Sequence, residues 1–170
     1  MARFGIEGAT LERIAEISGL ARPLIRHHAG NRDDLIDALF ERFQSQSSHA
    51  AKDLLQDLPA QDASLVLLDR LFDTSGDQTS ILLAEAFIAH STVNPDVAEA
   101  MSEWVSSYTG LICDVLATDF TKAEPSDIRI VATGVLGLQL NLTSLAPFLS
   151  LKEFSEESKA AAMRLIHTLS

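Results

Sequence analysis

The sequence predicts an all-α protein, with a short N-terminal helical unit followed by a larger helical domain. Apolar residues recur at three- and four-residue spacing over long stretches, which is the period of a helix. Only five prolines and eight glycines interrupt the 170 residues. With 46% hydrophobic and 22% charged residues, the composition is that of an ordinary globular protein, so we expect a packed helical core.

Clusters of Pro, Gly, Ser, Asn and Asp divide the chain into segments that are each typical of a helix. Asn31, Ser126 and Ser155 each precede acidic residues, as N-cap residues do, because acids stabilise the positive N-terminal end of a helix. The expected helices span residues 11–18, 22–29, 32–55, 64–72, 79–91, 95–119, 126–145 and 155–169.

The first two expected helices are short and are joined by a tight turn at Gly19. Glycine can adopt the positive φ that ends a helix, and Pro23 falls in the first turn of the next helix, where its missing N–H costs little. Leu20 and Ile25 resume the apolar pattern after the turn. This arrangement is typical of a helix-turn-helix, whose second helix enters the major groove of DNA.

Charge is distributed unevenly along this acidic chain, whose formal net charge is -11 at pH 7. Residues 1–32 hold five arginines against three glutamates, whereas residues 33–170 hold eight basic and 21 acidic residues. Within the first part, Gly19 to Arg32 contains three arginines, two histidines and no carboxylate. A local basic segment of this kind predicts contact with a phosphate backbone, and a solvated charged surface is the other interpretation.

The segment from Gly5 to about Phe43 resembles the DNA-binding segment of the TetR family of bacterial one-component repressors. The matching positions, in chain order, are Gly5-Ile6, Thr10-Leu11, Ile14-Ala15, Gly19-Leu20, His28, Asn31-Arg32 and Leu35. The resemblance implies a DNA-binding domain over residues 1–43 and an effector-binding and dimerisation domain over residues 44–170. It also implies a homodimer that binds a double-stranded operator and is released from it by a small-molecule effector.

The resemblance further assigns DNA contacts to particular positions of this chain. These are Thr10, Arg22, Pro23, Leu24, Arg26, His27, His28 and Arg32, the last standing where the family has a phosphate-binding lysine.

The chain also departs from the family's pattern. Only residues 1–4 precede Gly5, so the family's first helix is expected to be largely missing, and an N-terminally extended form is expected to bind its operator more tightly. Ala21 stands where the family has a serine N-cap, and Ala29 where it has a bulky aromatic. The alternative hypothesis is therefore a dimeric helical ligand-binding or interaction protein with a vestigial DNA-binding domain.

The larger domain contains an apolar stripe along residues 95–119 and polar groups on neighbouring helices. Small-molecule sites are typically apolar with a few polar anchors. The candidate effector contacts are Glu85, Phe87, His90, Met101, Trp104, Tyr108 and Asn141. An apolar stripe of this kind is more often core than pocket, so ordinary core packing is the favoured interpretation of any single one of these residues.

The segment from Ile130 to Leu151 carries no charge and is long enough to span a bilayer, for which about 20 apolar residues suffice. Gln139, Asn141 and Pro147 interrupt it, however, and its small residues allow another helix to approach closely. We expect a subunit interface and no membrane span. The expected interface residues are Val131, Gly134, Val135, Gly137, Leu138, Leu142, Met163 and Ile166.

No enzymatic activity, cofactor or metal site is predicted from the sequence. It contains no glycine-rich phosphate loop, no complete set of metal ligands and no nucleophile with an identifiable partner base. The single cysteine, Cys113, excludes an internal disulfide and lies in an apolar helical run. The N-terminus lacks the apolar segment of a signal peptide, so a cytoplasmic location is expected.

Overall fold

The computed structural model describes residues 6, 8–75, 79–145 and 150–170, and all regular secondary structure in these residues is helical. The elements are α1 (Leu11–Ser18), α2 (Arg22–Ala29), α3 (Arg32–Leu55), α4 (Ala63–Leu71), α5 (Thr79–Ser91), α6 (Pro95–Asp119), α7 (Pro125–Leu145), α8 (Leu151–Ile166) and a final 3₁₀ turn (His167–Leu169). The predicted all-α fold is confirmed, and each expected helix is present.

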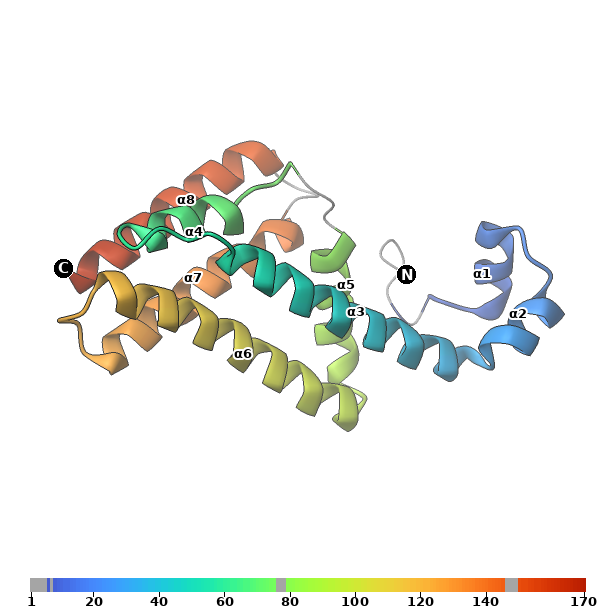
Figure 1. Ribbon diagram of the computed structural model, residues 1–170. Helices are drawn as coiled ribbons and strands as arrows, with labels where there is room; N and C mark the ends of the chain where they lie inside the picture. The colour runs from blue at the N-terminus through green and yellow to red at the C-terminus, as the bar shows by residue number, and fades with distance from the viewer. Residues whose placement is uncertain (1–5, 7, 76–78, 146–149) are drawn as a thin grey trace.

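The helices α1 and α2 project from one end of the molecule, and α3 leads from them into a larger helical body (Figure 1). In that body α7 packs between α6 and α8, while α4 lies against α6 and α8, and α5 contacts α3 and α6. α3 runs unbroken through residue 43, where the boundary between the two expected domains falls. A continuous helix therefore connects the N-terminal unit to the body.

Local signals in the sequence set the ends of the first three helices. Thr10 Oγ1 caps α1 by accepting a 3.3 Å hydrogen bond from a backbone N–H three residues on, and Gly19 ends it with φ of 69°. At the start of α3, Asn31 Oδ1 accepts from the Asp34 N–H (3.1 Å), and Asp34 Oδ2 accepts from the Asn31 N–H (2.8 Å). α2 begins after Ala21 without a side-chain cap, as the alanine predicts.

Two of the expected N-caps are wrong because the helices concerned begin earlier. α7 begins at Pro125, which is tolerated in a first turn, so Ser126 lies inside the helix. α8 begins at Leu151, and Ser155 lies a full turn inside it. There Ser155 is buried, and its hydroxyl donates a hydrogen bond to the carbonyl oxygen of Phe72. Ser155 therefore links α8 to the end of α4, a role that its local sequence does not indicate.

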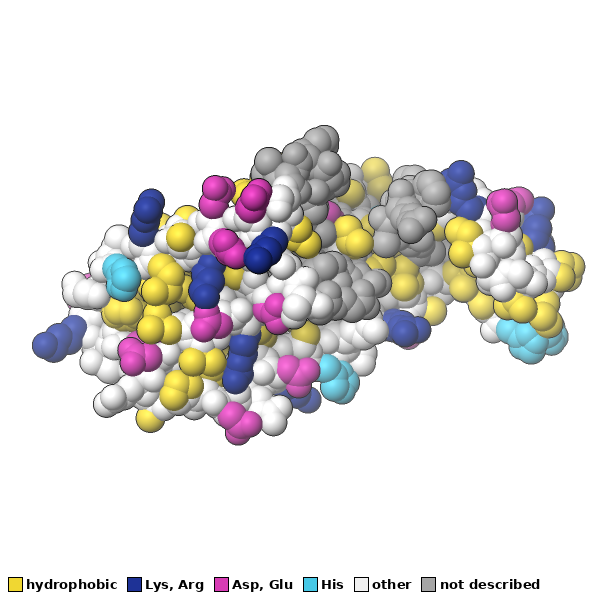
Figure 2. Space-filling view, turned by 90° about the horizontal axis from the view of Figure 1, so that it is seen from above, with side chains coloured by type: hydrophobic (Ala, Val, Ile, Leu, Met, Phe, Trp, Pro, Cys, Tyr) yellow, Lys and Arg dark blue, Asp and Glu magenta, His cyan; other side chains and the backbone are white. Residues whose placement is uncertain are grey.

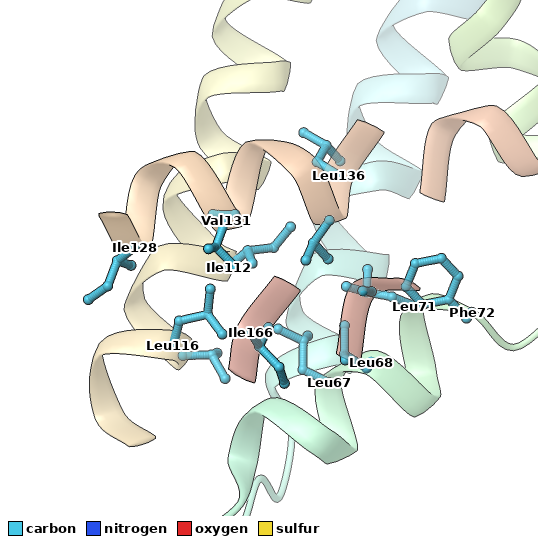
Figure 3. Close-up of a cluster of buried hydrophobic side chains, with 14 of the residues drawn as sticks. Leu67, Leu68, Leu71, Phe72, Ile112, Leu116, Ile128, Val131, Leu136 and Ile166 are labelled. Carbon is cyan, nitrogen blue, oxygen red and sulfur yellow. The ribbon is translucent and has the colours of Figure 1, made fainter. Parts of the chain in front are cut away.

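Two clusters of buried apolar side chains hold the helices together. The larger cluster joins α4, α6, α7 and α8, and Figure 3 labels Leu67, Leu68, Leu71, Phe72, Ile112, Leu116, Ile128, Val131, Leu136 and Ile166 within it. The smaller cluster joins α3, α5 and α6, and it also contains Ile6. A residue from the segment before α1 thus packs into the body of the protein.

None of the described helices is long and apolar enough to cross a membrane. The uncharged segment of α7 instead supplies core residues, among them Val131, Val135 and Leu136, to the larger cluster.

Candidate nucleic-acid interface and effector domain

α2 turns one apolar side chain inward and most of the others outward. Ile25 is buried, whereas Arg26, His27 and His28 are exposed, and the two histidine rings meet edge to face with their centroids 4.9 Å apart. Leu24 is 44% exposed on the same helix. Figure 2 shows basic and histidine side chains gathered at this end of the molecule, with acidic side chains close to the basic ones.

The structure brings a carboxylate to the acid-free stretch. Glu12 Oε1, on α1, lies 2.6 Å from Arg22 Nη2 at the start of α2, and more than half of each side chain is exposed. A backbone hydrogen bond in the first turn of α1, and to a smaller extent the Arg22 guanidinium, lower the pKa of Glu12 from its ordinary value. The carboxylate is therefore charged at neutral pH and neutralises Arg22. The sequence did not predict this contact, because Glu12 lies ten residues before Arg22 and outside the acid-free stretch.

Arg32, an expected phosphate contact, holds backbone carbonyl groups. Its Nε donates a 3.2 Å hydrogen bond to the Ala9 oxygen, and its Nη2 donates a 2.9 Å hydrogen bond to the Ile6 oxygen. The Asp33 carboxylate lies 3.6 Å from Nη1, and only 31% of the Arg32 side chain is exposed. Arg32 thus attaches the segment before α1 to the start of α3 and positions the N-terminal unit. Thr10, also expected to contact DNA, caps α1.

Large apolar side chains are exposed on α1 and in the turn that follows it. Ile17 is 70% exposed and Leu20 is 49% exposed, so the described residues leave this apolar surface open. Gly5, which matches the end of the family's first helix, lies outside the described residues. Its neighbour Ile6 is buried in the smaller cluster.

Four of the seven expected effector contacts come together in or beside the smaller cluster. Phe87 and Met101 are buried in it, and Trp104 packs against it and against Tyr108. Phe43 of α3 joins them, with ring centroids 5.5 Å from Phe87 and 5.6 Å from Trp104. The aromatic side chains form a continuous packed series between α3, α5 and α6.

Ser47 of α3, which sequence reasoning missed, holds this series by hydrogen bonds. The Trp104 Nε1–H donates to Ser47 Oγ (2.5 Å), and the Tyr108 hydroxyl donates to the Ser47 carbonyl oxygen (3.0 Å). Ser47 is 4% exposed. Burial raises the pKa of Tyr108, and its hydrogen bond with Ser47 opposes that shift. A single serine in a helix of mixed polarity carries no sequence signal of such a role.

The other three expected effector contacts are polar residues on α5 and α7. Glu85 and His90 are half-buried on α5, and Asn141 is exposed on α7. A cavity of about 420 Å³ lies at the C-terminal end of α6, where residues 60–62, 64–65, 118–120 and 166–167 line it. The Asp119 carboxylate there caps α4, accepting a 2.7 Å hydrogen bond from the Ser64 N–H. None of the seven expected residues lines this cavity.

Four of the eight expected interface residues belong to the core of the single chain. Val131, Val135, Leu142 and Ile166 are each at most 5% exposed and pack in the larger cluster, so we reassign them to the core. The expectation was wrong for these four because a uniformly apolar helix does not reveal which side its own chain covers. Gly134, Gly137, Leu138 and Met163 remain partly exposed.

The outer face of α7 carries other apolar groups beside these. Ile130 is 70% exposed and Leu145 is 37% exposed, and helical spacing places both on the same face as Gly137. A side-chain carbon at Gly137 would meet nothing within 4 Å, whereas at Gly134 it would lie 3.1 Å from the Leu165 side chain. Gly134 therefore serves the packing of α8 on α7, and Gly137 lies on the open face.

No protein-family model matches the sequence, and neither does any curated protein. Among solved structures, the chain is similar to a TetR-family transcriptional regulator from Rhodococcus sp., with a TM-score of 0.70 and 16% identity over 99% of this chain and 92% of that one. It is also similar to the TetR-family repressor AlkX from Dietzia sp. strain DQ12-45-1b, implicated in n-alkane biodegradation, with a TM-score of 0.51 and 15% identity over 97% and 90% of the two chains. The chain thus has the fold that the sequence resemblance implies.

Proposed function

We propose that this chain, which has the fold of TetR-family regulators, is a DNA-binding transcriptional regulator. The observation that carries the proposal is the exposed face of α2, where Arg26, His27 and His28 surround one buried anchor, Ile25. Arginine and histidine donate hydrogen bonds to phosphate, and arginine also pairs with guanine. The exposed Leu24 side chain suits an apolar contact with a thymine methyl group.

The regulator acts as a homodimer in this proposal. The outer face of α7 combines the exposed apolar side chains of Ile130 and Leu145 with Gly137 and the uncharged Asn141, which suits close packing against a second copy. Two α2 helices in a dimer would contact successive major grooves, about 34–36 Å apart on one face of the DNA. Because α3 links α2 to the body directly, a change in helix packing there would alter this spacing.

A small-molecule effector supplies that change in the same proposal. We place its site beside the aromatic series around Phe87, Trp104 and Tyr108, because these side chains contact α3 and combine apolar surface with buried polar groups. Trp104 is the single tryptophan of the sequence, so its fluorescence reports on this site alone. A ligand that shifts its emission and also weakens DNA binding would support the assignment.

The decisive experiment measures binding to duplex DNA over a range of salt concentrations. We expect affinity to fall steeply with salt, because phosphate contacts release counterions, and Arg26→Gln to weaken binding at every salt concentration. Lys122→Gln removes one positive charge between α6 and α7 and should leave binding unchanged. Footprinting on the DNA upstream of the coding sequence then tests for an operator.

The competing function is a helical ligand-binding or interaction protein whose N-terminal unit no longer binds DNA. Affinity that is weak, independent of salt and unaffected by Arg26→Gln would favour it. The observation that favours this second function is the exposure of two large apolar side chains, Ile17 and Leu20, on the N-terminal unit.

A further inference from the structure

We infer that Glu12 competes with DNA phosphate for Arg22 and so restrains the affinity of the N-terminal unit for DNA of any sequence. The inference rests on the proposed DNA-binding function and assigns to Glu12 a role in setting the affinity of that function. Glu12 stands outside the stretch that the sequence marks as basic, yet the fold places its carboxylate 2.6 Å from the first arginine of α2.

The position of Glu12 is set by the helix that carries it. Thr10 caps α1, and Glu12 follows in the first turn, where the backbone stabilises its charge. Arg22 is the first residue of α2, so the ion pair bridges the two helices of the helix-turn-helix. With 56% of the Arg22 side chain exposed, a phosphate can reach the guanidinium only in competition with a carboxylate that is already in place.

The pair changes the count of arginines that are available to DNA. Of the three in the acid-free stretch, Arg22 is paired with Glu12, and Arg32 donates to two backbone carbonyls. Arg26 is exposed and has no ion pair or hydrogen bond within the described part of the chain. Of the three arginines between Gly19 and Arg32, only Arg26 therefore has no partner among the described residues.

Restraining phosphate contacts has a functional consequence. Non-specific binding is almost entirely electrostatic, and each neutralised phosphate adds about 0.9 to the slope of log affinity against log salt concentration. An internal carboxylate that occupies Arg22 therefore lowers binding to random DNA, while base-edge contacts from α2 remain. Phosphate contacts carry no sequence information, so the ion pair lowers affinity about equally for all sequences and sets the strength of DNA binding.

Four variants test the inference on random-sequence duplex DNA: Glu12→Gln, Glu16→Gln, Arg22→Gln and the double variant Glu12→Gln/Arg22→Gln. Glu12→Gln is expected to bind about two- to fivefold more tightly at low salt, the range that one exposed ion pair sets. Its salt slope should steepen by about 0.9. Glu16 is exposed one turn further along α1, and no ion pair joins it to a described residue, so Glu16→Gln controls for net charge. Circular dichroism checks that each variant retains its helices.

The double-variant comparison isolates the competition. Arg22→Gln should cost more affinity in the Glu12→Gln background than in the native chain, because only there is Arg22 released to phosphate. Equal gains from Glu12→Gln and Glu16→Gln, or an unchanged cost of Arg22→Gln in the two backgrounds, would overturn the inference while leaving DNA binding intact. If the native chain and every variant bind DNA without salt dependence, the proposed function fails and the inference fails with it.

Discussion

Arg32 Nη2 donates a 2.9 Å hydrogen bond to the carbonyl oxygen of Ile6, and this contact joins the start of α3 to the segment before α1. The Ile6 side chain is at the same time buried in the smaller cluster with Phe87 and Met101. The N-terminal unit therefore joins the body through the continuous α3 and shares one apolar cluster with it. Arg32 thus has a structural role, in addition to the phosphate contact that the sequence resemblance assigns to it.

Replacing Arg32 should consequently destabilise the protein. Arg32→Ala removes the charged donor from the carbonyls of Ile6 and Ala9, and hydrogen bonds to charged groups are worth about 1.5–3 kcal/mol each. We expect urea unfolding at fixed protein concentration to show a loss of this order. Arg32→Lys keeps the charge but not the two-pronged geometry, so it should recover part of the stability. Unchanged stability of Arg32→Ala, together with weaker DNA binding, would instead favour a phosphate-binding role.

Two glycine-to-alanine substitutions should have opposite effects on stability. Gly19 has φ of 69°, a conformation that costs alanine about 1–2 kcal/mol, although no atom would contact the added carbon. Gly110 lies inside α6, where an added carbon also meets nothing within 4 Å. Gly110→Ala should therefore stabilise the protein by about 0.5–1 kcal/mol. Thermal unfolding of the two variants checks the signs, and a loss at both positions would contradict the prediction.

The hydrogen bonds of Ser47 should stabilise the contact between α3 and α6. Ser47→Ala leaves the Trp104 Nε1–H without its acceptor, and an unsatisfied buried donor costs about 1–3 kcal/mol. The emission of the single tryptophan should also change, because its indole environment is altered. Ser48→Ala, at an exposed position on the same helix, is the matched control and should change neither quantity.

The outer face of α7 can be tested without disturbing the core. Ile130→Glu places a charge at a side chain that is 70% exposed, so it should weaken a dimer through this face while leaving the helical content unchanged. Sedimentation velocity measures the shift towards monomer. Val93→Glu is a matched control, because Val93 is 72% exposed in the turn between α5 and α6. Equal sedimentation of the Ile130→Glu variant and the native chain would exclude this face.

Much of the fold was predictable because its signals are local. The period of apolar residues, the turn at Gly19 and the Asn31 cap each depend on residues that are a few positions apart. The same reasoning failed at Ser126 and Ser155, where acids after a serine occur inside a helix. A capping pattern establishes that a helix is near, whereas contacts with other helices help decide where it begins.

The sequence by itself determined the all-α class, the order of the helices and the basic character of residues 19–32. The tertiary structure alone decided that Glu12 meets Arg22, that Arg32 holds the Ile6 carbonyl and that Val135 faces its own core. The physical reason is that helical periodicity specifies which side chains share a face. The element that covers the face is set by packing between segments far apart in the chain.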